Sequence, residues 1–363
     1  MSNYLNHFAA ARDVVLPCLY TPPGTQIPDN AEFRPKAADT EAKKLSRLQL
    51  RVSSSTLPSV EKAVAKACQN LRVPRGSVHA FVSPALERNA HCFMNADEPI
   101  IVFGSALIEL MTEKELACVA GHEIGHFLLP EAHYLSDHES AEGRLHSRAA
   151  EITMDRIGLV ACDDVQAACL TEMKLLCGLK DPHLRADVSA FIEEARKAFD
   201  GSFRREEDAT HPPAQLRLRA ILEFANSDAF HNPHGRSGGK PIAEINQSVT
   251  RLLHEQIDRH IIAEMDEPVL MAKAWLYCLC KSHGTEVTTH ALNRIKPDVD
   301  EARLKRAWAS LAGFKGEQIC NHAHQRFAKS IENSHGMAPQ LTQQLMAWIK
   351  SEPAMKPIQH LLP

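Results

Sequence analysis

Residues 112–129 read TEKELACVAGHEIGHFLL, and this stretch decides the fold around it. Thr112 and Glu115 have the spacing of a capping box, in which the two side chains satisfy free backbone N–H groups at the start of a helix. Pro130 follows the stretch and cannot continue a helix. The pattern therefore predicts one helix from about residue 112 to residue 129.

Two histidines on this predicted helix form the pattern HExxH. His122 and His126 are four residues apart, so both imidazoles leave the same helix face and can meet one cation. Glu123 can reach a water on that cation without being a ligand, and this arrangement is typical of zinc hydrolases. Gly121 and Gly125 are unfavourable in mid-helix, which is explained if another backbone packs tightly against them, as around a buried metal.

A zinc ion held by two histidines needs a third protein ligand, which leaves its fourth position for water. Glu151 and Asp155 share one face of a helix predicted at 144–161. Glu151 can coordinate zinc, and Asp155 can accept the free ring N–H of a ligating histidine. The alternative is a solvated acidic face paired with Arg148 and Arg156.

The sequence predicts an α+β protein that is divided into three segments. Alternating and apolar runs predict strands near 78–82, 89–93 and 100–103. Helices are expected on both sides of them, at 39–52, 58–72, 164–178, 183–199, 212–226, 242–263, 267–282, 287–295, 300–312, 316–333 and 338–350. The expected parts are an irregular arm at 1–38, a domain at 39–230, and a helical C-terminal domain at 241–363 after the linker HNPHGRSGGK.

Composition excludes several classes of protein. The 363 residues hold 41 Lys+Arg against 45 Asp+Glu, a net charge of −4, which does not favour binding to nucleic acid or an anionic membrane. No signal peptide and no run of 18 apolar residues stands out, so we expect a soluble, cytoplasmic protein without a membrane span. The ten cysteines are expected to be mostly reduced core thiols, and His133, His138 and His146 to be solvent-exposed.

The motifs resemble those of a known family. GHEIGH at 121–126, followed 25 residues after His126 by ExxxD at 151–155, looks like the HtpX-like and CAAX-prenyl-protease family of zinc endopeptidases, which are gluzincins. Three further stretches are similar to elements of that family, and the matches span about 78–220: Asn89-Ala90 followed by PIIVF at 99–103, ELACV at 115–119, and THPP at 210–213 with Arg217. Met154 stands where the family has alanine, which puts the packing near the site in question.

The resemblance implies a fold and a site. The fold would be a mainly helical gluzincin metallopeptidase domain with a small edge sheet, followed by an all-helical C-terminal domain. One zinc ion would be held by His122, His126 and Glu151, with Asp155 behind a histidine. The absence of spanning segments places the chain with the soluble branch of the family.

The resemblance also implies residues that act on substrate. His211 and Arg217 are favoured as donors to the developing oxyanion, and Tyr134 is an alternative. An edge strand within 89–103 would pair with an extended peptide. The candidate substrate-binding residues there are Asn89, Ala90, Ile101 and Val102.

Two functional hypotheses follow. The first is a zinc endopeptidase that cleaves proteins or peptides, with Glu123 taking a proton from the zinc-bound water and passing it to the leaving amine. The second is a non-proteolytic binding or regulatory module with a structural zinc, which holds a protein partner through its C-terminal helices. Glu123 favours the enzyme, because a structural metal has no use for a general base. Hydrolysis of a non-peptide amide stays open.

Overall fold

The computed structural model describes residues 3–22, 38–86, 88–93, 96–133, 140–180, 182–185, 187–198 and 211–362. The chain divides into two compact units. The first comprises Met1–Ser136 and His146–Gln256, and the second comprises Asp137–Leu145 and Ile257–Pro363. The fold is α+β and mainly helical with one small sheet, so the predicted fold class is confirmed. The domain boundaries inferred from the sequence stay a prediction.

The sheet lies in the first unit and has four strands in the order β1-β2-β4-β3. These are β1 (Leu50–Arg51), β2 (His79–Ser83), β4 (Ile100–Gly104) and β3 (Ala90–Cys92). The central strands β2 and β4 run parallel, and each outer strand pairs antiparallel with its neighbour. The three predicted strands are confirmed. Since β4 is paired on both sides, β3 presents the free edge of the sheet on its side.

One predicted helix is wrong in its second half. The helix expected at 39–52 ends at Leu45, and Leu50–Arg51 instead pairs with β2. A two-residue strand has too little pattern to be recognised in a sequence, and the pairing with β2 decides its conformation.

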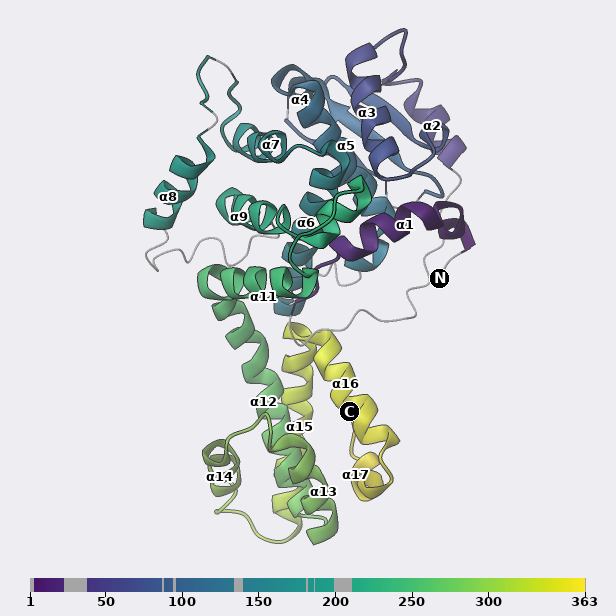
Figure 1. Ribbon diagram of the computed structural model, residues 1–363. Coiled ribbons are helices and arrows are strands. Elements are labelled where there is room, and N and C mark those ends of the chain that lie inside the picture. Colours follow the sequence, from purple (N-terminus) through teal and green to yellow (C-terminus); the bar gives the residue numbers. More distant parts are fainter. Residues whose placement is uncertain are drawn as a thin grey trace. The chain divides into compact units, whose positions relative to one another are not determined.

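Helices pack around the sheet in the first unit (Figure 1). The helix α5 (Glu113–Leu128) lies at the centre of this unit, in contact with α3, α7 and β3, and it begins with the predicted capping box of Thr112 and Glu115. The other helices of this unit are α2 (Ala38–Leu45), α3 (Pro58–Asn70), α4 (Ser105–Leu110), α7 (Val165–Cys177), α8 (Val188–Ala198), α9 (Ala214–Phe224), α10 (Asp228–His231) and α11 (Ile242–Leu253), with most of α6 (Ala141–Cys162).

The N-terminal residues, expected to be irregular, include a helix, α1 (Ala9–Val15), between two 3-10 turns. Phe8 packs edge-on against Phe127 of α5, with ring centroids 5.2 Å apart. The guanidinium of Arg12 donates to the carbonyl of Leu128, at the end of α5. This segment therefore supports the C-terminal end of the helix that carries both histidines of the HExxH pattern.

Glycine allows α5 and α6 to cross closely. A Cβ placed on Gly121 would overlap the Cβ of Ala161 and would lie 3.3 Å from the Cα of Gly158. A Cβ on Gly125 would meet the Sδ of Met154 at 2.8 Å. The interpretation that another backbone packs against these glycines is confirmed. Met154 is fully buried and fills the space that Gly125 leaves.

The described residues of the second unit form helices and turns. The long helices α12 (Arg259–Lys281) and α15 (Glu317–Met337) pack along each other, and their core includes Leu276, Phe327 and Ile349. The remaining helices are α13 (Thr285–Ile295), α14 (Glu301–Ala309), α16 (Pro339–Ser351) and α17 (Lys356–Gln359). In the parts of the chain that the structure describes, no helix is long and apolar enough to cross a membrane.

Candidate active site

The two histidines of α5 lie close together beside Glu123. One donor atom from each of His122, Glu123 and His126 can be chosen so that all three lie within 4.8 Å of one another. The two imidazole rings are 4.9 Å apart between centroids, at an angle of 73°. The helical spacing of four residues thus produces the convergence that the sequence implied.

Glu151 of α6 joins this group from the opposite side. Its Oε2 lies 3.6 Å from Nε2 of His122, and its Oε1 lies 3.4 Å from Nε2 of His211. Two ligands of one tetrahedral zinc, with bonds of about 2.0–2.2 Å, lie roughly 3.3–3.5 Å apart. The separation between Glu151 and His122 therefore suits a single metal ion, and the donor set of two imidazoles and a carboxylate suits zinc.

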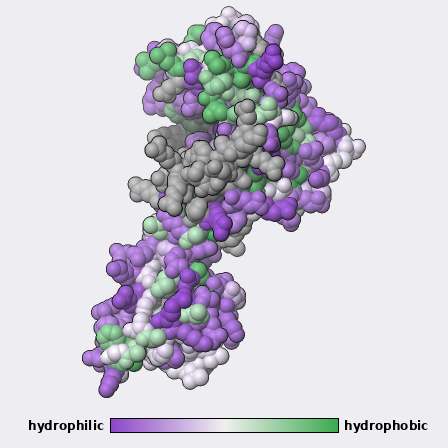
Figure 2. Space-filling model, turned by 90° about the vertical axis from the view of Figure 1, so that its left-hand side faces the viewer, coloured by the Kyte–Doolittle hydropathy of each residue, from purple (hydrophilic) through white to green (hydrophobic). Residues whose placement is uncertain are grey.

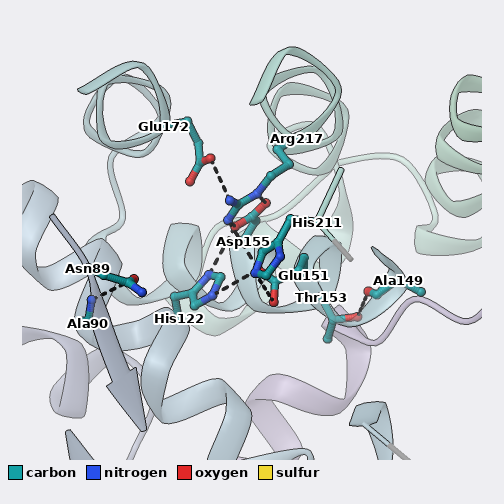
Figure 3. Close-up of polar contacts among 10 residues, drawn as sticks. All are labelled: Asn89, Ala90, His122, Ala149, Glu151, Thr153, Asp155, Glu172, His211 and Arg217. Carbon is teal, nitrogen blue, oxygen red and sulfur yellow. Dashed lines mark hydrogen bonds and ion pairs between the residues drawn. The ribbon is translucent and has the colours of Figure 1, made fainter. Parts of the chain in front are cut away.

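Asp155 lies one turn further along α6, behind His122. Its Oδ1 is 3.2 Å from Nδ1 of His122, so the carboxylate accepts a hydrogen bond from Nδ1–H, and Nε2 faces Glu151 (Figure 3). Burial lowers the pKa of His122, but the hydrogen bond to Asp155 and the nearby carboxylate of Glu151 outweigh burial and raise it to about 9. Asp155 thus fixes the tautomer and the orientation of His122.

Arg217 of α9 holds the carboxylates together. Its Nε donates to Oδ2 of Asp155 at 2.8 Å, and one terminal nitrogen lies 3.1 Å from Oε2 of Glu172 on α7. Burial is the largest single effect and raises the pKa of Asp155, but the charges and hydrogen bonds of Arg217 and His122 together outweigh burial and lower that pKa to about 2. The side chain expected to bind an oxyanion is thus engaged by Asp155 and Glu172 (Figure 3).

Glu172 was not identified from the sequence. It is 5% exposed and lines the same cavity as the histidines. Burial raises the pKa of Glu172 to about 7, although Arg217 opposes this shift. The available signal was its position four residues after Ala168 and three after Cys169, which places a carboxylate on the apolar face of a helix.

Glu123 points into the cavity from α5. It is 6% exposed, and burial raises its pKa to about 7, although His122 opposes this shift. A carboxylate with such a pKa near neutrality can both accept and release a proton at the operating pH.

A cavity of about 310 Å³ contains the candidate site. The β3 edge contributes Asn89 and Ala90 to its wall. The other lining residues come from helices α4, α5, α6, α7 and α9 and the segment before α9, and they include Leu107, Val119, His122, Glu123, His126, Glu151, Asp155, Leu175, His211, Arg217 and Ile221. The cavity thus brings together the predicted metal ligands, the candidate base and part of the edge strand.

The structure places several predicted residues elsewhere. Ile101 and Val102 are fully buried in β4, whose backbone is paired with β2 and β3, so they offer a peptide no free edge. His146 was expected to be exposed, but on α6 it is only 5% exposed, because its face of the helix is packed against the rest of the protein. Tyr134 and His138 lie outside the described residues.

A helix bearing HExxH, with a glutamate on the next long helix and a small sheet with a free edge beside it, is an arrangement typical of HExxH metallopeptidases. Comparison with known proteins agrees. Residues 54–140 match the sequence profile of Peptidase family M48. The match supports the family that the motifs of this region resemble.

One curated relative is the plastoglobule-localized metallopeptidase 48 of the chloroplast from Arabidopsis thaliana. It is 26% identical over 206 residues, which cover 48% of this chain and 59% of that protein. The chain therefore spans about three fifths of the length of this relative. No solved structure matches the chain significantly.

Proposed function

We propose that this protein is a zinc-dependent endopeptidase that hydrolyses peptide bonds of proteins or peptides. The observation that carries the proposal is the position of Glu123, a buried carboxylate beside two histidines of one helix, with Glu151 on the facing helix. A metal site that served only stability would not need this additional carboxylate.

His122, His126 and Glu151 would hold the metal, one ion per chain. Zinc bound there would supply a Lewis acid that polarises the scissile carbonyl and acidifies a bound water. Asp155 keeps Nε2 of His122 free to coordinate by occupying Nδ1. Arg217 forms ion pairs with Asp155, Glu172 and Glu151, and its positive charge reduces the cost of burying three carboxylates near one another.

Glu123 would carry the proton during hydrolysis. It would take one proton from the attacking water and deliver one to the nitrogen of the leaving amine. Because Glu123 is buried, bulk water has little access to its carboxylate. Its pKa of about 7 suits both taking the proton from water and giving it to the amine.

The strand β3 would bind the substrate backbone. The segment Ala90–Cys92 pairs with β4 on one side, and an extended peptide adding to its other side would lie against the cavity that contains His122. His211 lies at the cavity with 63% of its side chain exposed, which leaves it within reach of a bound peptide. We assign it the role of donor to the oxyanion in place of Arg217.

The compartment is a further part of the proposal. The ten free cysteines favour the cytoplasm, whereas the name of the Arabidopsis relative places that protein at plastoglobules. Fractionation of cells that express the tagged chain separates the two, since a lipid-associated protein floats with lipid bodies in a density gradient.

The test compares Glu123→Gln with Glu113→Gln, which changes an exposed glutamate of the same helix. On a fluorogenic peptide library with zinc-loaded protein, kcat/KM should fall about 10²–10⁴-fold in Glu123→Gln and stay near wild type in Glu113→Gln. Both variants should retain zinc.

The alternative is the binding module, which predicts a different result. In that case the wild type would hold zinc but cleave no peptide or protein, and Glu123→Gln would be indistinguishable from it. Loss of zinc from Glu123→Gln would contradict the assignment of Glu123 as a base that is not a ligand.

A further inference from the structure

Three exposed leucines lie in two segments of the chain that also contribute residues to the cavity wall. Leu86 is 94% exposed, Leu176 is 57% exposed and Leu179 is 47% exposed. Leu86 lies in the connection between β2 and β3, and the other two lie at the end of α7 and just after it. We call these three side chains the leucine rim. Large apolar side chains with such exposure are costly to keep in water, so a cluster of them marks a contact surface.

The two segments that carry the rim are held in place by α4 and by each other. The carbonyl of Ala85 accepts from the N–H of Ala106 and the hydroxyl of Ser105, both at 3.3 Å, at the start of α4. The ammonium of Lys180 donates to the carbonyl of Glu109 near the end of α4.

Arg88 closes the gap between these two segments. Its Nε lies 2.7 Å from the position that a Cβ on Gly178 would take, so the guanidinium rests directly on the glycine that ends α7. The rim is therefore presented on a fixed scaffold.

The leucine rim adjoins lining residues of the cavity along the chain. Asn89 and Leu175 line the cavity, and they lie three residues after Leu86 and one residue before Leu176. Figure 2 shows apolar surface gathered in the upper part of the first unit on the face it presents. An extended chain rises about 3.3 Å per residue, so a peptide paired with Ala90 reaches the level of Leu86 within about four residues.

Resting on the proposed peptidase function, we infer that the leucine rim binds an apolar segment of the substrate some four to six residues from the scissile bond. The partner is an extended segment of unfolded polypeptide, because backbone pairing along β3 leads such a chain directly to the rim. The edge strand contributes affinity without sequence choice, and the rim adds a preference for exposed apolar residues, which folded proteins bury.

Two fluorogenic peptides test this inference. They share one cleavable centre; one carries Leu and Phe four to six residues away on both sides, and the other carries Ser and Asn there. Wild type should cleave the apolar peptide with a KM about tenfold lower. The triple variant Leu86→Ser/Leu176→Ser/Leu179→Ser should lose this preference but cleave the polar peptide as wild type does.

A matched control is Leu48→Ser/Leu50→Ser, which changes two exposed leucines near β1, at the opposite edge of the sheet. It should keep the tenfold preference. The single variant Leu86→Ser should lose part of the preference. Because this side chain is too exposed to support the fold, the single variant still tests the inference if the triple variant unfolds.

Three outcomes overturn the inference. The first is an equal KM of wild type for both peptides, and the second is a preference that the rim variants retain. The third is a loss in the rim variants of only their binding to phosphatidylcholine vesicles, which would assign the rim to lipid. Failure of the peptidase function itself is distinguishable, because then wild type cleaves neither peptide. Anisotropy of labelled peptides on Glu123→Gln still reports rim binding in that case.

Discussion

Replacement of Gly121 by alanine should disrupt the candidate metal site without touching any ligand. The added Cβ overlaps the Cβ of Ala161, which is fixed to the α6 backbone, and lies 3.3 Å from the Cα of Gly158. Carbon atoms normally approach no closer than about 3.5 Å, so the two helices must separate locally by at least about 1 Å.

The energetic consequence can be worked out in two parts. Overpacking of this size costs about 3 kcal/mol, and the higher helix propensity of alanine returns about 1 kcal/mol, which leaves a net loss of about 2 kcal/mol in the free energy of unfolding. The effect on the metal is larger, because metal–ligand distances tolerate only about 0.2 Å. His122 and Glu151 lie on the two helices that separate, so zinc affinity should fall about 100-fold or more.

Urea unfolding and competition with a zinc chelator measure the two effects. Gly336→Ala is the control, since a Cβ on this helical glycine meets nothing within 4 Å and should not destabilise the protein. The double variant Gly121→Ala/Ala161→Gly removes the overlap and should recover most of the zinc affinity. Wild-type affinity in Gly121→Ala, or no recovery in the double variant, would refute the close crossing of α5 and α6.

Three other predictions concern the surroundings of the site. Asp155→Asn removes the charge that orients His122, and zinc affinity in a chelator competition should fall about 10–100-fold; an unchanged value would contradict this role. Burial lowers the pKa of His146 to about 4, so as the pH falls the unfolded chain binds a proton at this position before the folded protein does. Between pH 7 and pH 5, wild type should therefore lose about 2 kcal/mol more unfolding free energy than His146→Leu in urea titrations. Equal losses in the two proteins would contradict this prediction. Arg12→Met frees the carbonyl of Leu128 and should lower the unfolding free energy by about 1–2 kcal/mol, with equal urea midpoints as the opposing result.

Much of the metal-site geometry could be predicted because it is local. A spacing of four residues places His122 and His126 on one face of any helix, and the capping box fixes where that helix begins. The glycines of α5 carried non-local information as well, since their cost in mid-helix is explained only by a close neighbour. The structure identifies this neighbour as the segment around Gly158 and Ala161 of α6.

The misses have a common physical origin in tertiary contacts. Glu172 acts through Arg217, 45 positions later in the chain, and no local pattern joins them. Ile101 and Val102 could be recognised as a strand, but sheet order decides which strand is at the edge, and this order is not written in the alternation of residues. His146 lies within the predicted helix, but the tertiary packing of α6 decides which of its faces is buried, and that packing is not written in the local pattern.

The zinc content of the purified protein tests the central claim most directly. After dialysis against a weak chelator, mass spectrometry of the metal should give one zinc per chain for wild type and for Glu172→Gln, whose side chain lies in the same cavity without being assigned as a ligand. Glu151→Ala should lose most of the metal, since His122 and His126 alone provide too few ligands. Equal zinc in wild type and Glu151→Ala would contradict the assigned site.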